Sequence, residues 1–183
     1  VAIIGAGVFG AGTAWHLGRA GKSVRLLDAY GAGHWRASSG GESRVIRMGY
    51  GADTIYSDMA KESLGYWKDL SDTASLPIFH NAGVLWFAPA GDTYTAQSLD
   101  WFKANHVGHE HGDVDWLQRN WRQIQFYQGE TGILEKDGGA LIAGRAVDVR
   151  GAIGGSPRVT ASASSPAAAF TGCGSFQCGS RMR

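Results

Sequence analysis

The chain begins VAIIGAGVFGAGTAWHLGRAGKSVRLLD (residues 1–28), and this stretch decides the fold. A short apolar run is followed at once by the three glycines of a G-x-G-x-x-G motif, which are Gly5, Gly7 and Gly10. Small and apolar residues then recur at helical spacing as far as Gly21, which is placed to end a helix. A second apolar run ends on Asp28. This order of strand, glycine turn, helix, strand and acidic residue predicts a βαβ dinucleotide-binding unit.

Each position of the motif has a physical role in holding a pyrophosphate. Gly5 permits a tight turn, Gly7 removes the side chain where the phosphates approach, and Gly10 lets the helix pack closely against the strand. The N–H groups at the start of the helix, together with its positive dipole end, receive the phosphates. Asp28 is expected to accept hydrogen bonds from both ribose hydroxyls, and its charge disfavours a 2′-phosphate.

Composition narrows the class of protein. The 183 residues carry 17 Lys and Arg against 16 Asp and Glu, and this balance gives no case for a nucleic-acid or membrane partner. A hydrophobic content of 44% excludes a wholly disordered chain. No apolar run approaches the roughly 20 residues of a membrane span. Two cysteines cannot build a disulfide framework, so we expect a soluble, cytoplasmic protein.

The composition shifts near residue 150. Gly, Ala and Ser supply 18 of the 33 residues in 151–183, which contain no Asp, Glu or Lys. Only RVTASA (158–163) shows a short alternation typical of a strand. Such a segment has little apolar surface to offset its ordering entropy, so 150–183 is predicted to be a low-complexity, disordered tail. A shifted reading frame is the alternative that we favour for its origin.

The segment DAYGAGHWRASSGGESRVIRMGYG (28–51) carries a polar, glycine-rich loop into a pair of arginines, Arg44 and Arg47. This run resembles the second flavin-contacting loop of the D-amino-acid-oxidase superfamily, in particular its branch of monomeric sarcosine oxidase and N-methyltryptophan oxidase. Members of that branch carry a similar glycine–acid–hydroxyl–Arg–x–x–Arg run sixteen residues after the ribose acid. Arg44 likewise lies sixteen residues after Asp28. The resemblance implies FAD as the cofactor.

The resemblance extends more loosely to residue 149. It relates 53–70 to the helix after the loop, 78–91 to the first strand pair of the substrate domain, and 120–147 to the approach to the next helix. It implies an α/β fold, with a Rossmann-like FAD-binding βαβ unit and the start of a mixed-sheet substrate domain, incomplete in this chain. The predicted domains are 1–75 (the N-terminal part of the FAD-binding domain), 76–149 (a partial substrate domain and return helix) and the tail 150–183.

In this family FAD oxidises the C–N bond of a secondary or N-methylated amino acid. Hydride passes to flavin N5, and O2 reoxidises the flavin to give peroxide, so the implied partners are a small amine or amino-acid substrate and O2. The implied cofactor-binding residues are Gly5, Gly7, Val8, Phe9, Gly10, Asp28, Ser38, Ser39, Ser43 and Arg44. The implied catalytic residues are Arg44, close to the isoalloxazine ring, and Arg47, which pairs with the substrate carboxylate. A planar guanidinium suits that role because it can grip a carboxylate bidentately.

Two alternatives stay open. An NAD-dependent dehydrogenase uses the same opening fold, although the loop before Arg44 argues against it. The second alternative is an inactive truncated product. It follows from the resemblance, because the family's flavin-linking cysteine, its oxygen-activating lysine and a second carboxylate-binding cation lie in a part that this sequence lacks.

Two further groups are predicted to be structural. HVGHEHGD (106–113) contains three histidines and two acids, and we expect a solvated polar loop there rather than a metal site. Within 53–70, an apolar stripe predicts the packing face of a helix with Asp53 as its N-cap. The stripe consists of Ile55, Met59, Tyr66 and Leu70.

Overall fold

The computed structural model describes residues 1–31, 34–39, 41–73, 77–147 and 159–163. The chain divides into two compact units that interleave along the sequence. The first unit comprises Val1–Arg44, Asp72–Ile78 and Ile142–Arg183, and the second comprises Val45–Ser71 and Phe79–Leu141. The three consecutive domains predicted from the sequence do not describe this interleaving.

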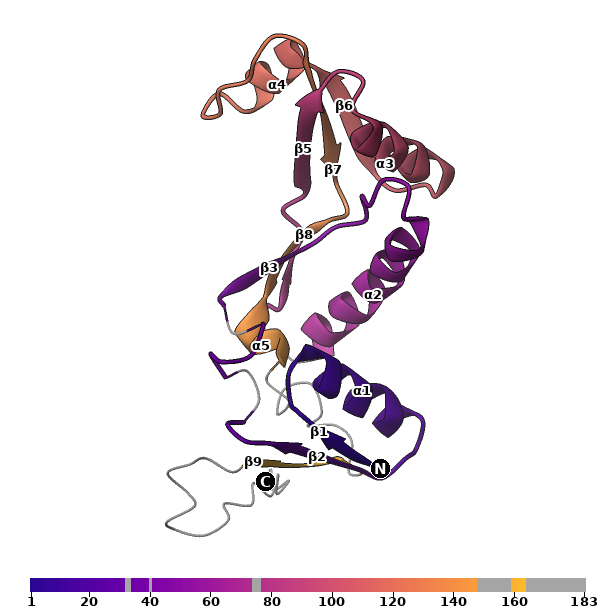
Figure 1. Ribbon diagram of the computed structural model, residues 1–183, viewed down its shortest axis with the longest axis vertical. Helices are drawn as coiled ribbons and strands as arrows, with labels where there is room; N and C mark the ends of the chain where they lie inside the picture. Colours follow the sequence, from indigo (N-terminus) through magenta and orange to yellow (C-terminus); the bar gives the residue numbers. More distant parts are fainter. Residues whose placement is uncertain (32–33, 40, 74–76, 148–158, 164–183) are drawn as a thin grey trace. The chain divides into compact units, whose positions relative to one another are not determined.

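The first unit contains the predicted βαβ motif. Strands β1 (Ala2–Ile4) and β2 (Val24–Asp28) are parallel, and helix α1 (Val8–Arg19) connects them (Figure 1). Alanines dominate the buried side of α1 and pack with residues of β2. Such small side chains let the helix axis approach the sheet closely. The buried residues of this core are Ala6, Ala11, Ala14, Val24 and Leu26.

Helix α1 ends at Arg19, and Gly21, the glycine predicted to end it, follows the C-cap Ala20 with a φ of +76°. The Gly21 N–H donates to the carbonyl of Gly18 at 3.0 Å, and the Lys22 N–H donates to the carbonyl of Leu17 at 3.0 Å. This pair of bonds is the Schellman arrangement, in which a residue with positive φ follows the last helical turn.

A third strand, β9 (Val159–Ala163), lies beside β2 and gives the sheet the order β1-β2-β9 (Figure 1). It runs parallel to β2 along the full length of that strand, from Val24↔Val159 to Asp28↔Ala163. The prediction of a disordered tail therefore does not hold for these five residues, where the alternation in RVTASA was the sequence signal. The rest of 150–183 lies outside the described residues, and the shifted reading frame stays a prediction.

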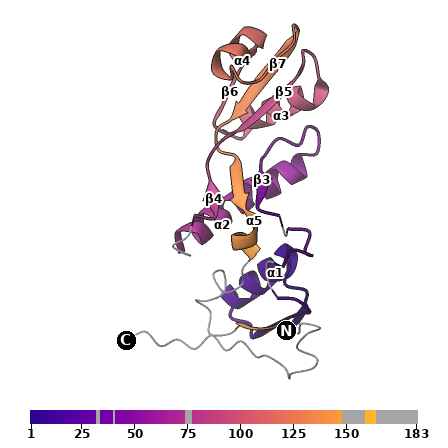
Figure 2. The same ribbon diagram turned by 90° about the vertical axis from the view of Figure 1, so that its left-hand side faces the viewer.

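The second unit contains an antiparallel sheet with the order β5-β7-β6 (Figures 1 and 2). Its strands are β5 (Val84–Pro89), β6 (His109–Asp113) and β7 (Glu130–Glu135). The same unit contains helices α3 (Thr93–Ala104) and α4 (Val114–Asn120). Each helix starts after an aspartate cap: Asp92 accepts the Thr95 N–H and Asp113 accepts the Trp116 N–H. Parallel and antiparallel sheets together confirm the predicted mixed α/β class.

A further short sheet has the order β3-β8-β4. Its strands are β3 (Ser43–Ile46), β4 (Phe79–His80) and β8 (Gly139–Ile142), and helix α5 (Ala143–Val147) follows β8. The prediction of a strand pair over 78–91 is wrong in one respect. Strand β4 pairs with β8 whereas β5 pairs with β7, so these two consecutive strands belong to different sheets.

Helix α2 (Thr54–Thr73) begins directly after Asp53, but the predicted packing face is wrong. Its buried residues are Ser57 and Leu64, which lie seven positions, about two helical turns, apart. Ile55 and Met59 of the stripe are 64% and 59% exposed, because they lie on the side of the helix opposite to the buried Ser57. Hydrophobicity alone selected the wrong side of this helix. Within the described ranges, no helix is both long and apolar enough to cross a membrane.

Candidate dinucleotide site and arginine slot

A tight turn follows β1 and lies beside the carboxyl end of the parallel strand β2. Gly5 has a φ of +99°, and its N–H donates to the carbonyl of Leu27 at 2.7 Å. The next amide, of Ala6, donates to Asp28 Oδ2 at 2.7 Å. The glycine turn and the acidic residue therefore lie at one edge of the sheet, as expected for parallel strands.

Asp28 is held by backbone amides on both carboxylate oxygens. Besides the bond from Ala6, Oδ1 accepts the N–H groups of Tyr30 at 2.7 Å and Gly31 at 3.0 Å. Burial acts to raise the pKa of Asp28, but these three hydrogen bonds and the charge of His34 outweigh it and lower the pKa below its usual value. About one of the roughly four acceptor positions of the carboxylate is left. A contact of Asp28 with both ribose hydroxyls stays a prediction. It would require the amide of Tyr30 or Gly31 to release its hydrogen bond to Oδ1.

The glycines of the motif differ in what the fold requires of them. A Cβ added at Gly10 would lie 1.8 Å from the carbonyl oxygen of Gly5, so no side chain fits there, as predicted for close helix packing. Gly7 has a φ of −72°, and an added Cβ would have nothing within 4 Å. Neither packing nor backbone conformation explains a glycine at Gly7. The open space in front of it suits a ligand.

The start of α1 offers donors to that space. Gly7 is the N-cap and supplies no side-chain hydrogen bond to the first turn. The amides of Val8 and Phe9 are the first two of this 12-residue helix, where backbone N–H groups have no intrahelical acceptor. Donors at a positive dipole end fit the pyrophosphate of a dinucleotide such as FAD.

Arg44 folds back onto its own loop. Its Nη1 donates to the carbonyl of Ser43 at 2.7 Å, and its Nη2 donates to the carbonyl of Ser38. A Cβ at Gly41 would lie 2.9 Å from Nη1, so the guanidinium also covers that glycine. The structure thus brings Ser38, Ser43 and Arg44 together, with Ser39 half-buried in the same loop. Contacts of these residues with a flavin stay predictions.

Arg47 belongs to the second unit and lies in an aromatic slot. Its guanidinium carbon is 4.7 Å from the ring centroid of Trp86 and 4.9 Å from that of Tyr50. Nη1 donates to the carbonyl of Gly49 at 3.2 Å and to the hydroxyl of Tyr94 at 3.3 Å. Among the described residues these hydrogen bonds engage Nη1 alone, which leaves Nε and Nη2 for a bidentate contact with a carboxylate.

Sequence reasoning missed the residues that hold this slot. Trp86 and Tyr94 carried no signal that separated them from ordinary packing residues. Glu135 ends the strand ETGILE (130–135) and is completely buried, which is rare for a glutamate. Burial raises the pKa of Glu135; hydrogen bonds and the charge of Arg47 act in the opposite direction without outweighing it. The one sequence signal that could have revealed Glu135 is an acidic residue at a position of the strand where the side chain is buried.

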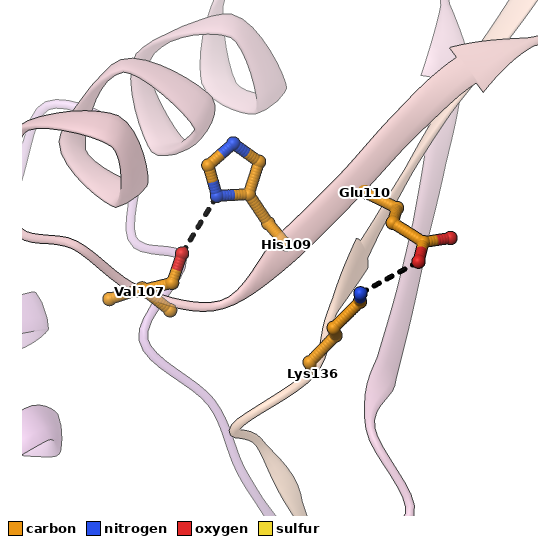
Figure 3. A network of polar contacts seen from close by, with 4 residues as sticks. All are labelled: Val107, His109, Glu110 and Lys136. Carbon is orange, nitrogen blue, oxygen red and sulfur yellow. Dashed lines mark hydrogen bonds and ion pairs between the residues drawn. The ribbon is translucent and has the colours of Figure 1, made fainter.

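Residues 109–113 of the histidine-rich segment form strand β6, not the polar loop predicted for 106–113, whereas 106–108 are not part of a strand. Because neighbouring side chains of β6 point to opposite faces, His109 and Glu110 have different environments. His109 Nδ1 lies 2.7 Å from the carbonyl oxygen of Val107, and Glu110 forms an ion pair with Lys136 at 2.7 Å (Figure 3). In the described part of the chain, no group of three or more His, Cys, Asp or Glu residues could hold a metal.

The fold and the turn at Gly5–Gly10 define a dinucleotide-binding protein. Residues 1–149 match the DAO family, described as FAD dependent oxidoreductase. The chain therefore belongs to this family, whose members depend on FAD.

Curated relatives agree with this assignment. The chain is 34% identical over 146 residues to peroxisomal sarcosine oxidase of Mus musculus, a match that covers 79% of this chain. It is 30% identical over 139 residues to N-methyl-L-tryptophan oxidase of Salmonella arizonae, and 28% identical over 144 residues to monomeric sarcosine oxidase of a Bacillus species. These matches cover 76% and 78% of the chain. In each case the chain spans 37% of the relative's length.

Solved structures share the fold. NikD, an amino acid oxidase of nikkomycin biosynthesis, superposes with a TM-score of 0.64 at 20% identity, covering 88% of this chain and 42% of NikD. A modified fructosyl peptide oxidase from Aspergillus nidulans superposes with a TM-score of 0.69 at 20% identity, covering 87% of this chain and 40% of that enzyme.

Proposed function

We propose that this chain is the nucleotide-binding part of an FAD-dependent oxidoreductase that oxidises the C–N bond of a secondary or N-methylated amino acid. The observation that carries the proposal is the open space at Gly7, bordered by the start of α1 and by the turn locked to Asp28. Bound there, FAD would supply the acceptor for hydride from the carbon beside nitrogen, with peroxide formed on reoxidation by O2.

The residues of this chain would bind and orient. The amides of Val8 and Phe9 would hold the pyrophosphate, and Asp28 would accept a ribose hydroxyl. Ser38, Ser39, Ser43 and Arg44 would form the loop against the flavin. Arg47 would hold the substrate carboxylate and so fix the angle of the reacting carbon, since bound geometry is a large part of catalysis.

Cytoplasmic location stays a prediction of the sequence. The relatives from Mus musculus and Homo sapiens are both named peroxisomal sarcosine oxidase.

The cofactor site is tested by titrating FAD into the 183-residue chain and following flavin fluorescence. We expect Gly7→Val to abolish binding, because its side chain would fill the space in front of the α1 amides. Loss of a glycine N-cap should itself cost only about 1 kcal/mol of stability. Gly12→Ala is the matched control: Gly12 also has nothing within 4 Å of an added Cβ, but it lies a turn further along α1.

Three outcomes would contradict the proposal. FAD that binds Gly7→Val as tightly as the unsubstituted chain would remove the site. No binding of FAD by the unsubstituted chain would contradict the proposal that these residues form the cofactor site. Binding of NAD in preference to FAD would favour the dehydrogenase alternative.

A further inference from the structure

The carboxylate of Glu135 is engaged from two directions. Its Oε1 accepts the N–H of Met48 at 2.6 Å, and its Oε2 accepts the indole Nε1–H of Trp86 at 3.1 Å. The backbone amide of Gly49 also acts to lower the pKa of Glu135. Glu135 has no exposed surface, so these donors replace the water that the carboxylate loses on folding.

The groups that Glu135 holds are the groups that surround Arg47. Trp86 supplies one aromatic wall of the slot. The backbone that carries Met48 and Gly49 follows Arg47 directly, and the Gly49 carbonyl accepts from both Arg47 Nη1 and the hydroxyl of Tyr94. The Trp86 ring and the backbone at Met48 and Gly49 therefore both depend on one buried side chain, Glu135, which lies 87 residues after Met48 in the sequence.

Close packing makes this arrangement specific. A Cβ at Gly49 would lie 2.8 Å from the Trp86 ring and 3.3 Å from that of Phe102. Gly51 has a φ of +59°, and a Cβ there would lie 2.7 Å from the ring of Tyr94. The segment that follows Arg47 thus fits its surroundings only as glycine at both positions.

A stability role alone explains Glu135 poorly. Buried ionisable groups replaced by well-packed apolar residues often leave stability unchanged or improved. Ordered polar contacts of this kind instead specify one geometry, here that of the backbone beside a guanidinium.

We propose that Glu135 is a positioning residue for Arg47: it fixes Trp86 and the 48–49 backbone, and so holds the guanidinium with Nε and Nη2 presented to a substrate carboxylate. The inference rests on the proposed function for the identity of that ligand. Glu135 itself acts through these neighbours and not on the substrate.

The test uses the ¹⁵N-labelled 183-residue chain and the NMR signal of Arg47 Nε–H, assigned by its loss in Arg47→Met. The rings of Trp86 and Tyr50, whose centroids lie 4.7 and 4.9 Å from the guanidinium carbon, should shift this signal by their ring currents. We expect Glu135→Gln to remove most of that shift, because an amide cannot accept the Trp86 and Met48 donors with both of its terminal atoms. An Arg47 signal that is unchanged in Glu135→Gln would overturn the inference.

Ligand binding gives a second readout. N-methylglycine should move the Arg47 signal in the unsubstituted chain, whereas dimethylamine, which lacks the carboxylate, should not. In Glu135→Gln we expect affinity to fall at least about tenfold, equivalent to about 1.4 kcal/mol. Affinity that is equal in Glu135→Gln and lost in Arg47→Met would overturn the role of Glu135 while leaving the proposed role of Arg47 intact.

Glu110→Gln is the matched control. Glu110 lies on β6, the neighbouring strand of the same sheet, and forms an ion pair with Lys136 (Figure 3). Its variant should keep both the Arg47 signal and the affinity. If the unsubstituted chain does not bind N-methylglycine, the proposed substrate contact fails, and the ring-current readout still decides whether Glu135 positions Arg47.

A measurement on the unsubstituted chain covers the case in which Glu135→Gln does not fold. Lowering the pH to protonate Glu135 should move the Met48 amide and the Arg47 Nε–H signals with one shared midpoint. Among the described residues, the titratable groups to compare are Tyr50 and Tyr94, which contact Arg47, and His109, the cross-strand partner of Glu135. An Arg47 signal that follows His109 and ignores Glu135 would overturn the inference.

Discussion

Asp28 and Glu135 are both carboxylates that accept backbone hydrogen bonds, yet their pKa values move in opposite directions. Asp28 is half-buried, and three amides with His34 outweigh the effect of its burial. Glu135 is fully buried, and loss of water outweighs its donors and Arg47. The same side-chain chemistry therefore anchors the glycine turn in one unit and the arginine slot in the other, and local solvation sets the direction of each pKa shift.

The raised pKa of Glu135 predicts the pH dependence of stability. The folded state binds the proton more tightly than the unfolded state, so the contribution of Glu135 is fully present below pH 4.5, its unperturbed value. It should be lost as pH rises through the raised pKa. We therefore expect the free energy of unfolding of the unsubstituted chain, minus that of Glu135→Gln, to decrease over this window.

Urea unfolding between pH 4 and pH 8, followed by tryptophan fluorescence, measures this difference. Repeating the comparison in a His109→Gln background separates the titration of the cross-strand histidine. A difference that increases with pH in both backgrounds would contradict the sign of the shift.

At the scale of elements, the ends of the helices carry much of the local specificity. Helix α1 ends in a Schellman arrangement at Gly21, and α3 and α4 each begin at an aspartate that caps a backbone amide. These signals are local in sequence, since each joins residues within about five positions. The face that a helix buries is not local, which is why the stripe of α2 was placed wrongly.

Gly21→Ala tests the C-terminal end of α1. Alanine at a φ of +76° should cost roughly 1–2 kcal/mol of the free energy of unfolding. Gly12→Ala, inside the same helix with open space around an added Cβ, should instead be neutral or stabilising by up to about 1 kcal/mol. Equal effects of the two substitutions would show that backbone conformation at Gly21 does not limit stability.

At the scale of the whole molecule, the chain forms two units whose segments alternate along the sequence. The chain spans 37% of the length of the curated relatives considered above. The resemblance to the family implies that a second carboxylate-binding cation and an oxygen-activating lysine belong to the part of the relatives that the 183 residues do not match.

We therefore expect no sustained peroxide production when the 183-residue chain is supplied with FAD and N-methylglycine. A peroxidase-coupled dye assay measures this, with free FAD under the same illumination as the blank. Continuous peroxide formation above the blank, dependent on N-methylglycine and lost in Arg47→Met, would contradict the prediction and show that these residues suffice.

The sequence by itself determined the βαβ unit, the turn at Gly5–Gly10, the position of Asp28 and the helix end at Gly21. Each of these depends on backbone conformation or spacing within a short stretch, so residue type is enough to reveal it. The resemblance of 28–51 to a flavin loop extended this to the family.

Only the tertiary structure decided the rest. Strand β9 pairs with β2 across 135 positions (Val24↔Val159), and Glu135 reaches Met48 across 87. Residues 109–113 of the histidine-rich segment form a strand because β7 offers them a partner, not because of their own pattern. Pairing and burial between distant segments depend on which surfaces the folded chain brings together, and hydrophobic periodicity within one segment does not encode that choice.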